Sequence, residues 1–595
     1  MSNTPHSTET RVPLDALRNG KRRLRHQLKG RQPDDAAREA VCALIGPGPH
    51  ARDRLIEHLH RLNDAQGALF EPMLVALAAE MRLAMAEVVE VASFYHHFQI
   101  LPDGARAPEV TLRVCDGLSC EMAGAQGLRQ ALDGTLAPGV RLTPAPCVGR
   151  CEQAPVAVLG QRPVPHASEA GIRAALAGGD TAHPLPASSH ARFDPVAFAP
   201  GEVPSDETIA PDAVGYAAYR AAGGYRLAAD VVNSERSADS VIEALEHAGL
   251  RGLGGAGFPA GRKWRIVRGF PAPRLMAVNI DEGEPGTFKD RTFLERDPHR
   301  FLEGVLIAAQ VVGCEAVYLY LRDEYAGCRA LLARELALLQ ADPPCPLPHI
   351  ELRRGAGAYI CGEESAMIES IEGKRGEPRL RPPYIAEVGL FGRPTLEHNF
   401  ETLYWVRDIV ERGPAWFTGF GRHGRQGLRS FSVSGRVKRP GVKLAPAGIT
   451  LRELVDEFCG GMAEGHVLYG YLPGGASGGI LPAALADVPL DFDTLQPHGS
   501  FIGSAAVVVL GQHDRARDAA LNAMRFFADE SCGQCTPCRV GTEKAARLME
   551  ATAWDHATLD DLSAVMADAS ICGLGQAAPN AIRCVQRYFG DEVTK

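Results

Sequence analysis

The sequence predicts an α/β protein of several domains, and three observations support this. The 595 residues exceed what one hydrophobic core can hold and suggest roughly four domains. Hydrophobic residues make up 45% and charged residues 23% of the chain, which is ordinary globular composition. Stretches with helical spacing alternate with short β-rich runs along most of the length, the pattern of layered α/β domains.

The N-terminal third divides into a tail, a helical bundle and a small α/β unit. Residues 1–40 are polar, and residues 21–31 carry six basic side chains, so we interpret this part as a mobile basic tail that serves solubility or docks on an acidic partner. Apolar residues recur at three- and four-residue spacing in residues 41–105, which predicts a short helical bundle. Residues 106–177 combine strand-like runs with two helical stretches, which predicts a small α/β unit.

The remaining two thirds follow a linker. Residues 178–212 are rich in Pro, Ser, Ala and Gly and lack a sustained period, which is typical of a linker. In residues 213–425, helical stretches alternate with β-rich runs such as LMAVNI, which predicts a layered α/β domain. Residues 426–512 are expected to form a small β-rich domain around one helix. Residues 513–595 are predicted to be helical, with cysteines at both ends.

Composition also excludes several classes of protein. No window reaches 18 apolar residues, so we expect no membrane span. The basic run is followed by polar residues instead of an apolar stretch, so it does not resemble a secretory signal. The net charge, 63 − 72 = −9, offers no general footprint for nucleic acid. We therefore expect a cytoplasmic protein whose large partners are other proteins and whose 15 cysteines do not form disulfides.

The C-terminal cysteines have the spacing of an iron-sulfur site. Cys532, Cys535 and Cys538 lie three residues apart, and Cys572 follows at a distance, so four thiolates can close on one group. Structural zinc sites usually pair two C-x2-C knuckles, whereas three evenly spaced cysteines with a remote fourth favour a 4Fe-4S cluster. The pattern therefore predicts a 4Fe-4S cluster, with structural zinc as the alternative.

A second set of four cysteines lies in the small α/β unit. Cys115 and Cys120 form C-x4-C, Cys147 and Cys151 form C-x3-C, and both pairs follow strand-like runs. This spacing suits a 2Fe-2S cluster, in which each iron takes two cysteines, and from spacing alone zinc stays an alternative. The other seven cysteines show no pairing pattern, and we interpret them as small buried hydrophobic residues.

A glycine-rich loop indicates a phosphate group as ligand. Gly252, Gly254 and Gly257 match G-x-G-x-x-G but follow a helical stretch, so the ordinary dinucleotide-binding fingerprint is not satisfied. Lys263 adds a positive charge nearby, and the small side chains let backbone N–H groups approach a phosphate closely. A nucleotide is therefore a reasonable ligand, and a plain glycine turn is the alternative.

An acidic loop follows the strand-like run LMAVNI. Residues 279–290 crowd an amide, carboxylates and glycines at a strand end, where ligands bind in open α/β sheets. Carboxylates accept hydrogen bonds from ribityl or ribose hydroxyls and repel a 2′-phosphate, so NAD fits better than NADP. Gly362, Glu363 and Glu364 repeat this chemistry in GAGAYICGEES. The alternative is a solvated acidic turn.

These motifs carry a resemblance that covers nearly the whole chain. Residues 213–589 resemble the flavin-bearing, NADH-oxidising 51-kDa subunit of respiratory complex I, through GLGGAGFPAGRKW, NIDEGEPGTFKDR, GAGAYICGEES, HNFETL and ESCGQCTPCRVGT. Residues 41–177 resemble its 24-kDa partner subunit, through ASFYHHF, C-x4-C and APCVGRC. The fused chain resembles diaphorase subunits of NAD-reducing hydrogenases. It resembles more closely the β subunit of NAD-dependent molybdenum or tungsten formate dehydrogenases, through KGRQPD, YLPGGASGGILPA and LDFDTLQPHGSFIGSAAVVVL.

The resemblance implies a fold for each part and ligands for the motifs. It implies a thioredoxin-like 2Fe-2S domain beside the N-terminal helical bundle, a Rossmann-like FMN/NAD domain, a small β-grasp (ubiquitin-like, SLBB-like) domain and a C-terminal helical bundle with the 4Fe-4S cluster. The implied FMN-binding residues are Gly252, Gly254, Lys263, Asn279, Asp281, Glu282, Gly362, Glu363, Asn399 and Thr402. The implied NAD contacts are Phe258, Glu284, Glu364 and Tyr384. The chain departs from the usual residues of the family at Leu253, Ile266, Arg381 and His398.

The resemblance also implies a function. FMN carries the chemistry, and the protein supplies no catalytic acid, base or nucleophile. A separate iron-sulfur-rich molybdenum or tungsten α subunit is expected to oxidise formate, while this chain passes the electrons through its clusters to FMN and NAD⁺. A higher oligomer of such heterodimers is expected. The alternatives are the diaphorase of a hydrogenase, a fused complex I module, and a non-enzymatic iron-sulfur or zinc scaffold.

Overall fold

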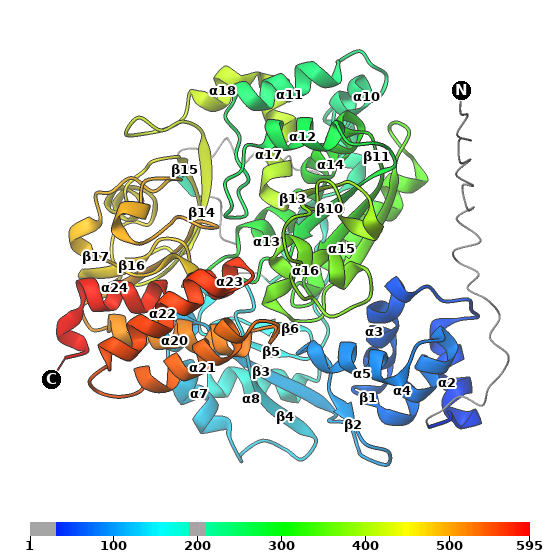
Figure 1. Cartoon of the computed structure of the whole chain (residues 1–595), viewed down its shortest axis with the longest axis horizontal. Coiled ribbons are helices and arrows are strands. Elements are labelled where there is room, and N and C mark those ends of the chain that lie inside the picture. Colours follow the sequence, from blue (N-terminus) through cyan, green and yellow to red (C-terminus); the bar gives the residue numbers. More distant parts are fainter. Residues whose placement is uncertain (1–30, 190–200, 203–208, 595) are drawn as a thin grey trace, which may run out of the picture.

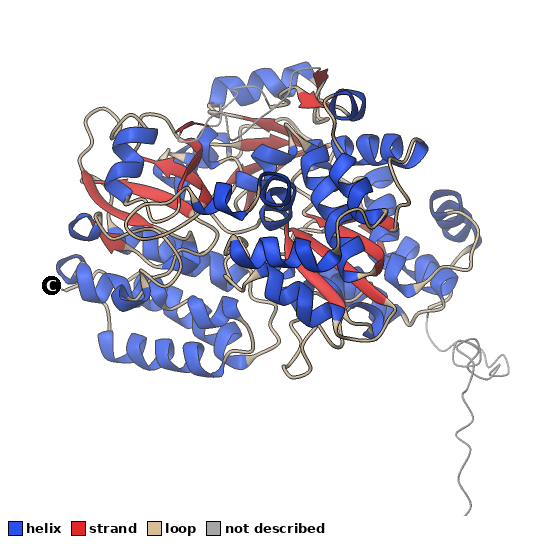
Figure 2. Ribbon diagram, turned by 90° about the horizontal axis from the view of Figure 1, so that it is seen from above, coloured by secondary structure: helices blue, strands red, loops and turns tan. Residues whose placement is uncertain are grey.

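The computed structural model describes residues 31–189, 201–202 and 209–594 (Figure 1). Most of the basic tail expected at residues 1–40 lies outside the described residues. Helices surround the strands in the view from above (Figure 2). Within the described ranges, no helix is long and apolar enough to cross a membrane.

Four helices form the N-terminal helical unit, and local sequence sets their ends. The first helix begins inside the expected tail because the Asp34 carboxylate accepts a 2.7 Å hydrogen bond from the Ala37 amide. The helix α3 (Leu55–Gln66) ends at Gly67, whose φ of 73° lies in the left-handed region that glycine adopts freely. The elements are α2 (Asp35–Ile45), η1 (Arg52–Arg54), α3 (Leu55–Gln66), α4 (Glu71–Met81) and α5 (Met85–Phe94), with β1 (Leu69–Phe70) paired in parallel to β2 (Ile100–Leu101).

A four-stranded sheet with the order β4-β3-β5-β6 forms the small-sheet unit. Along β3 the side chains of Leu112 and Val114 are buried and alternate with less buried neighbours, as expected for a strand with one covered face. β3 and β4 are parallel, so their carboxyl ends meet at the same edge. The elements are β3 (Val110–Cys115), α6 (Leu118–Met122), α7 (Ala125–Leu132), β4 (Val140–Ala145), η2 (Cys151–Gln153), β5 (Ala157–Leu159), β6 (Arg162–Val164) and α8 (Glu169–Gly178).

The predicted linker contributes short strands to its neighbours. β7 (Ser188–Ser189) pairs in parallel with β9 (Ala213–Val214), and β8 (Gly201–Glu202) pairs antiparallel with a strand of the mixed-sheet domain described below. Such pairing satisfies the free N–H and C=O groups of an open sheet edge. Composition alone does not reveal it, because each strand has only two residues.

A four-stranded parallel sheet with the order β12-β11-β10-β13 is the centre of the parallel-sheet domain. The run LMAV in β10 is fully buried, which is typical of a parallel sheet covered by helices on both faces. The elements are α9 (Tyr216–Ala221), α10 (Arg226–Val232), α11 (Ala238–His247), α12 (Ala260–Arg268), β10 (Arg274–Ile280), α13 (Lys289–Leu294), α14 (Pro298–Val312), β11 (Cys314–Leu321), α15 (Ala326–Ala341), β12 (His349–Arg354), η4 (Tyr359–Gly362), α16 (Glu364–Ile371), η5 (Leu390–Gly392), β13 (Thr395–Asn399), α17 (Phe400–Arg412) and α18 (Pro414–Thr418).

The mixed-sheet domain has six strands in the order β17-β16-β18-β14-β15-β8. β14 is antiparallel to β15 and parallel to β18, and the α19 turn with the π-helical turn η6 follows the hairpin. The elements are β14 (Leu428–Gly435), β15 (Gly441–Pro446), α19 (Leu451–Glu453), η6 (Leu454–Phe458), β16 (Leu468–Leu472), η7 (Ala476–Gly478), β17 (Leu481–Pro482), η8 (Ala483–Leu485), η9 (Gln496–His498) and β18 (Ala506–Gly511).

The C-terminal helices lie next to the mixed-sheet domain and the small-sheet unit (Figure 1). Asn522 on α20 donates a 2.9 Å hydrogen bond to the carbonyl of Asp116. One hydrophobic cluster joins the N-terminal helices, the parallel sheet and these helices, through residues such as Leu74, Ala277 and Met524. The elements are α20 (Ala516–Asp529), α21 (Thr536–Met549), α22 (His556–Ala569), α23 (Gly573–Ala577), α24 (Asn580–Tyr588) and η10 (Gly590–Glu592).

Candidate nucleotide and iron-sulfur sites

The predicted nucleotide residues meet at the carboxyl edge of β10 and β13. Asn399 is the last residue of β13, Asn279 is the last but one of β10, and the two lie opposite each other in the parallel register. In the sheet, β11 and β12 lie on one side of β10, and β13 lies on its other side. The strand order therefore reverses at β10. Open α/β sheets bind ligands outside the carboxyl ends of their strands at such a reversal.

The glycine loop is attached to the start of α17. Its backbone closes through a 3.1 Å hydrogen bond from the Gly257 amide to the Gly252 carbonyl, and the Leu253 amide donates to Thr402 Oγ1 at 2.9 Å. A Cβ at Gly254 would lie 2.9 Å from Cβ of Asn399. Only glycine fits this approach, so the loop, α17 and the end of β13 form one cradle.

A buried carboxyl group of the acidic loop, that of Asp281, lies beside Gly362 and keeps one oxygen without a partner among the described residues. Asn279 donates a 2.8 Å hydrogen bond to the Gly362 carbonyl, and its own oxygen accepts from the Asp281 amide at 2.9 Å. Oδ2 of Asp281 is buried and has no hydrogen-bond partner among the described residues. Burial raises the pKa of Asp281 well above its ordinary value. Such an orphaned polar atom fits a site completed by a polar ligand.

Lys263 supplies the positive charge at this edge. Its Nζ lies 3.2 Å from Oε2 of Glu397 and donates to the Glu397 carbonyl at 3.1 Å. Glu364 lies close to both groups, and burial, followed by the charge of Glu397, raises the pKa of the Glu364 carboxyl. The edge therefore combines one lysine with two carboxylates.

Glu282 has a different environment from the one its motif suggested. Its carboxylate accepts hydrogen bonds from the Asp290 amide at 2.8 Å, the Arg291 amide at 3.1 Å and the Tyr325 hydroxyl at 2.8 Å. Burial, with the nearby negative charge of Asp290, raises the pKa of Glu282 to about 7. All three hydrogen bonds are made within the protein, so this side chain shapes the acidic loop.

Glu284 is held by two residues that sequence reasoning missed. Its carboxylate accepts from the Ser477 amide at 2.8 Å, from Ser477 Oγ at 3.1 Å and from the Tyr359 hydroxyl. A Cβ at Gly475 would lie 2.7 Å from Cγ of Glu284, so the loop before Ser477 needs glycine to come this close. Tyr359 stands inside GAGAYICGEES and Ser477 inside PGGASGG, and those glycines were the available signal.

The remaining predicted nucleotide residues lie at helix starts or on the surface. Glu363 caps α16 by accepting hydrogen bonds from the Ser365 and Ala366 amides, each at 2.9 Å. Arg381 pairs with the carboxylates of both Glu363 and Glu364. Phe258 and Tyr384 are 39% and 60% exposed, and the Arg262 guanidinium lies 5.7 Å from the centre of the Phe258 ring. Exposed aromatic side chains of this kind can stack on a ligand.

The second cysteine set converges in the small-sheet unit. Cys115 ends β3, Cys120 lies on α6, and Cys147 and Cys151 follow β4, and all four are buried. The sulfur atoms of Cys147 and Cys151 are 3.3 Å apart. Hydrogen bonds from Cys115 and Cys151 lower the pKa of Cys147. Thiols this crowded and buried away from water are suited to hold a metal group.

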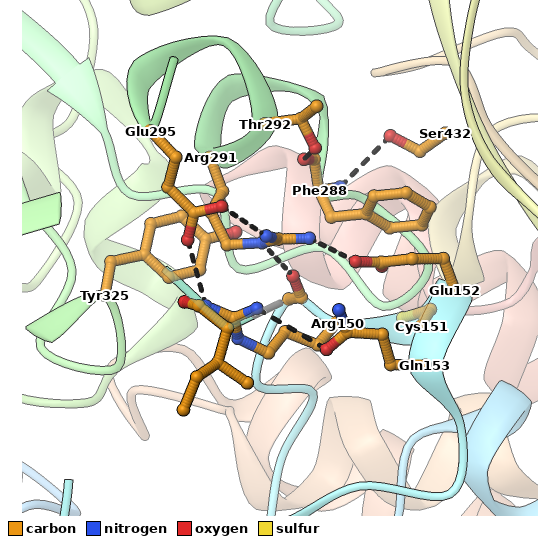
Figure 3. A network of polar contacts seen from close by, with 12 residues as sticks. Arg150, Cys151, Glu152, Gln153, Phe288, Arg291, Thr292, Glu295, Tyr325 and Ser432 are labelled. Atoms are coloured by element: carbon orange, nitrogen blue, oxygen red, sulfur yellow. Dashed lines mark hydrogen bonds and ion pairs between the residues drawn. The ribbon is translucent and has the colours of Figure 1, made fainter. Parts of the chain in front are cut away.

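A buried ionic network joins the Cys151 loop to the parallel-sheet domain (Figure 3). The Arg291 guanidinium pairs with Glu152 and, at 2.7 Å, with Glu295, and it donates to the Gly149 carbonyl at 2.8 Å. Arg150 pairs with Glu295 from the other side at 2.9 Å. Each charged group in the network has an opposite partner, as burial requires.

The C-terminal cysteines gather at helix starts. Cys535 precedes α21, Cys572 precedes α23, and Cys538 lies in the first turn of α21. Cys532, Cys535 and Cys572 are partly exposed, and Cys538 is buried. Burial raises the pKa of Cys572, and the backbone N–H groups of Gly575 and Leu574 oppose this by donating to its sulfur. The start of α23 thus directs two N–H groups toward the Cys572 sulfur.

Family models match four parts of the chain. The Nuo51 FMN-binding domain matches residues 245–408, and the thioredoxin-like [2Fe-2S] ferredoxin matches residues 42–179. The NADH-ubiquinone oxidoreductase-F iron-sulfur binding region matches residues 518–595, and the SLBB domain matches residues 430–481. The protein is therefore a mixed α/β chain with a thioredoxin-like 2Fe-2S domain and an FMN-binding domain.

Relatives match over most of their own length. An NADH-quinone oxidoreductase subunit of Rhizobium meliloti (strain 1021) is 40% identical over 417 residues, which are 67% of this chain and 97% of that protein. The mitochondrial NADH-ubiquinone oxidoreductase 51 kDa subunit of Neurospora crassa is 39% identical over 376 residues, 60% of this chain and 76% of that protein. The chain belongs to the family of these NADH-oxidoreductase 51 kDa subunits.

This member of the 51 kDa family also resembles solved structures along most of its length. A chain of the NAD⁺-reducing [NiFe]-hydrogenase in the H₂-reduced state aligns with a TM-score of 0.77 and 32% identity, covering 92% of this chain and 93% of that chain. The expected cofactors are thereby confirmed: FMN, NAD, a 2Fe-2S cluster and a 4Fe-4S cluster. The protein is an oxidoreductase subunit that binds NADH and FMN.

Proposed function

We propose that this chain is the NAD-reducing diaphorase subunit of a cytoplasmic formate dehydrogenase. The observation that supports electron exchange most directly is a bridge made by one guanidinium. Arg322 donates to the Cys147 carbonyl at 2.7 Å and also to the Glu282 carbonyl. The loop of the second cysteine set and the acidic loop of the nucleotide edge are therefore immediate neighbours.

The nucleotide residues are proposed to divide between FMN and NAD. The cradle at Gly254, the orphaned Oδ2 of Asp281 and the charge of Lys263 fit a flavin mononucleotide, which presents a phosphate and ribityl hydroxyls. The proposed FMN residues are Gly252, Gly254, Lys263, Asn279, Asp281, Glu282, Gly362, Glu363, Asn399 and Thr402. Of these, Glu282 would act through the acidic loop that it shapes. The proposed NAD residues are Phe258, Glu284, Glu364 and Tyr384.

The two cysteine sets are proposed to ligate the two clusters. Cys115, Cys120, Cys147 and Cys151 would hold the 2Fe-2S cluster, since four buried sulfurs converge there. Cys532, Cys535, Cys538 and Cys572 would hold the 4Fe-4S cluster, with the N–H groups of Leu574 and Gly575 near the sulfur of Cys572. The mixed-sheet domain is proposed to be a β-grasp, and the N- and C-terminal helices to be separate bundles.

The residues of the chain bind and orient, while the cofactors carry the redox chemistry. When bound, FMN exchanges a hydride with the nicotinamide and single electrons with iron-sulfur clusters. The carboxylates of Glu284 and Glu364 would accept hydrogen bonds from ribose hydroxyls and would disfavour a 2′-phosphate, which would select NAD over NADP. Tyr359 and Ser477 fix Glu284 before any ligand arrives, so little ordering remains for binding.

The partner is proposed to be an iron-sulfur-rich α subunit that oxidises formate at molybdenum or tungsten, in a higher oligomer of heterodimers. The support is the resemblance of the segments YLPGGASGGILPA and LDFDTLQPHGSFIGSAAVVVL to formate dehydrogenase β subunits. A hydrogenase partner is the second candidate, favoured by the NAD⁺-reducing hydrogenase chain that aligns over 92% of this chain. The two candidates differ only in the source of electrons.

The metal content of the native complex decides between these partners. The complex that co-purifies with this chain is analysed by elemental mass spectrometry and assayed for formate-dependent reduction of NAD⁺. Molybdenum or tungsten together with iron, and reduction driven by formate, are expected. Nickel with iron and reduction driven by hydrogen would assign the chain to a hydrogenase, and iron alone would indicate a complex I type of dehydrogenase.

A further inference from the structure

Three metal-ligating side chains meet outside the nucleotide and cysteine sites. One nitrogen of His60, one nitrogen of His97 and one carboxylate oxygen of Asp64 all lie within 4.8 Å of one another. His60 and Asp64 are four residues apart on α3, so they share one face of that helix. His97 follows α5 and brings the third ligand from a separate segment.

Both histidines are already oriented by an outer partner. Nε2 of His60 lies 2.9 Å from the Gly355 carbonyl oxygen, and Nδ1 of His97 lies 2.7 Å from Oδ2 of Asp323. Carbonyl and carboxylate oxygens accept hydrogen bonds, so these two nitrogens carry the protons. The lone pairs are left on Nδ1 of His60 and Nε2 of His97. Metal-ligating histidines are typically held in this way by a carbonyl or a carboxylate.

His60 provides an independent observation that points to a ligand. The residue is only 3% exposed, and its Nδ1 has no hydrogen-bond partner among the described residues. A buried polar atom without a partner is rare in a native protein and needs a partner of its own.

Asp64 and His97 each keep a lone pair that can bind an ion. Nη1 of Arg354 lies 2.5 Å from Oδ2 of Asp64, while the next contact, from Nη2 to Oδ1, is 3.4 Å long, so the carboxylate retains lone pairs. Nε2 of His97 has only a 3.3 Å contact with the Asn63 side-chain amide. Asn63, Asp64 and His97 line a cavity of about 890 Å³, which gives an ion and a water molecule access.

We propose that His60, Asp64 and His97 bind one zinc-type divalent cation, with water as the fourth ligand. Two imidazoles and a carboxylate suit zinc, which prefers four ligands of this kind. Gly355 and Asp323, which orient the imidazoles, belong to the parallel-sheet domain. The ion therefore joins the N-terminal helical unit to that domain.

The test uses the full-length chain with both clusters loaded, because empty cysteine sites would also bind zinc. The protein is equilibrated with Zn²⁺, dialysed against metal-free buffer and analysed for zinc by mass spectrometry and for ligand type by X-ray absorption at the zinc edge. We expect one zinc per chain with nitrogen and oxygen ligands only. We also expect thermal unfolding of the chain to shift upward when zinc is added.

Variants separate this site from the others. His60→Gln and His97→Gln are each expected to lower zinc affinity more than 100-fold, and Asp323→Asn about tenfold by releasing the His97 ring. The matched control is His96→Gln, since His96 is adjacent in sequence but exposed, and it is expected to bind zinc like the parent chain. Sulfur ligands at the zinc edge, equal binding by His97→Gln, or absence of zinc from the parent chain would each overturn the proposal.

Discussion

At the residue scale, buried carboxyl groups define the nucleotide edge. Asp281, Glu282 and Glu284 lie within four positions of one another, yet their surroundings differ. Glu282 accepts hydrogen bonds from the start of α13 and from Tyr325, Glu284 is held by a distant loop, and Asp281 keeps an oxygen without a partner among the described residues. One acidic motif therefore divides into a structural, a positioned and a ligand-ready carboxyl group.

Ser477→Ala tests the positioning of Glu284. The variant loses the 3.1 Å hydrogen bond from the hydroxyl but keeps the one from the backbone amide. A hydrogen bond to a charged group contributes about 1.5–3 kcal/mol, so we expect KM for NADH to rise about tenfold with little change in iron content. Steady-state NADH-dye reductase kinetics measure this. Ser168→Ala, which removes the cap of α8, is the control, and an unchanged KM for Ser477→Ala would contradict the assignment.

Glu282→Gln tests the environment of Glu282 through pH. Burial raises the pKa of this carboxyl from 4.5 to about 7, so the folded chain binds its proton more tightly than the unfolded chain. The contribution of Glu282 to the free energy of unfolding is therefore fully present at low pH, and it is lost as the pH rises from 4.5 to about 7. We expect the Tm of the parent chain to fall more steeply than that of the variant over this window, measured by calorimetry. Parallel Tm curves would show that Glu282 titrates normally.

At the element scale, the contact between η2 and α13 joins two domains through charges. Arg291 on α13 has two carboxylate partners, Glu152 and Glu295, and its side chain is only 5% exposed. A buried pair contributes little compared with apolar packing, but removing one partner leaves a charge without compensation. We infer that this network helps to specify how the small-sheet unit docks on the parallel-sheet domain.

Arg291→Met is expected to destabilise this docking strongly. Breaking a buried ion pair by removing one partner costs about 3–5 kcal/mol. Denaturant unfolding, followed by the absorbance of the 2Fe-2S cluster, measures the loss. Arg173→Met is the matched control, because Arg173 forms an exposed pair with Glu169 and such pairs contribute about 0–1 kcal/mol. Equal effects of the two substitutions would refute a specific role for the network.

At the scale of the whole molecule, the cysteine sets lie on different domains around one nucleotide edge. The second set contacts the acidic loop through Arg322, and the C-terminal set lies at the starts of α21 and α23 with three partly exposed members. Partial exposure suits the exchange of electrons with a partner protein. The chain can then connect a nucleotide to an external acceptor or donor.

Cys535→Ser separates the reduction of the flavin by NADH from electron transfer between this chain and its partner. We expect NADH to reduce the flavin at the normal rate, since the nucleotide edge is unchanged, while electron transfer to or from the partner complex falls to background. Stopped-flow absorbance of the flavin and electron paramagnetic resonance of the clusters measure the two steps. Cys42→Ser, in α2, is the control. Normal reduction of the partner's clusters by Cys535→Ser would show that Cys535 does not ligate a cluster on the electron path.

Local patterns in the sequence determined much of this protein. The spacing of cysteines is a local property of the sequence. The pairs that begin at Cys115 and Cys147 and the triple that begins at Cys532 can therefore be recognised without the fold. The same holds for the alternation of β3 and the apolar run of β10. The expected α/β character and the four cofactors follow from such patterns and from the resemblance they carry.

Only the tertiary structure decided which distant groups meet. Ser477 binds Glu284 across 193 positions, Arg322 reaches Cys147 across 175, and the linker strand β8 extends a sheet formed far along the chain. None of these contacts has a local signature, because a hydrogen bond between remote segments depends on how whole domains pack. The sequence therefore determined the kinds of site this protein carries, and the packing of its domains decided which residues complete them.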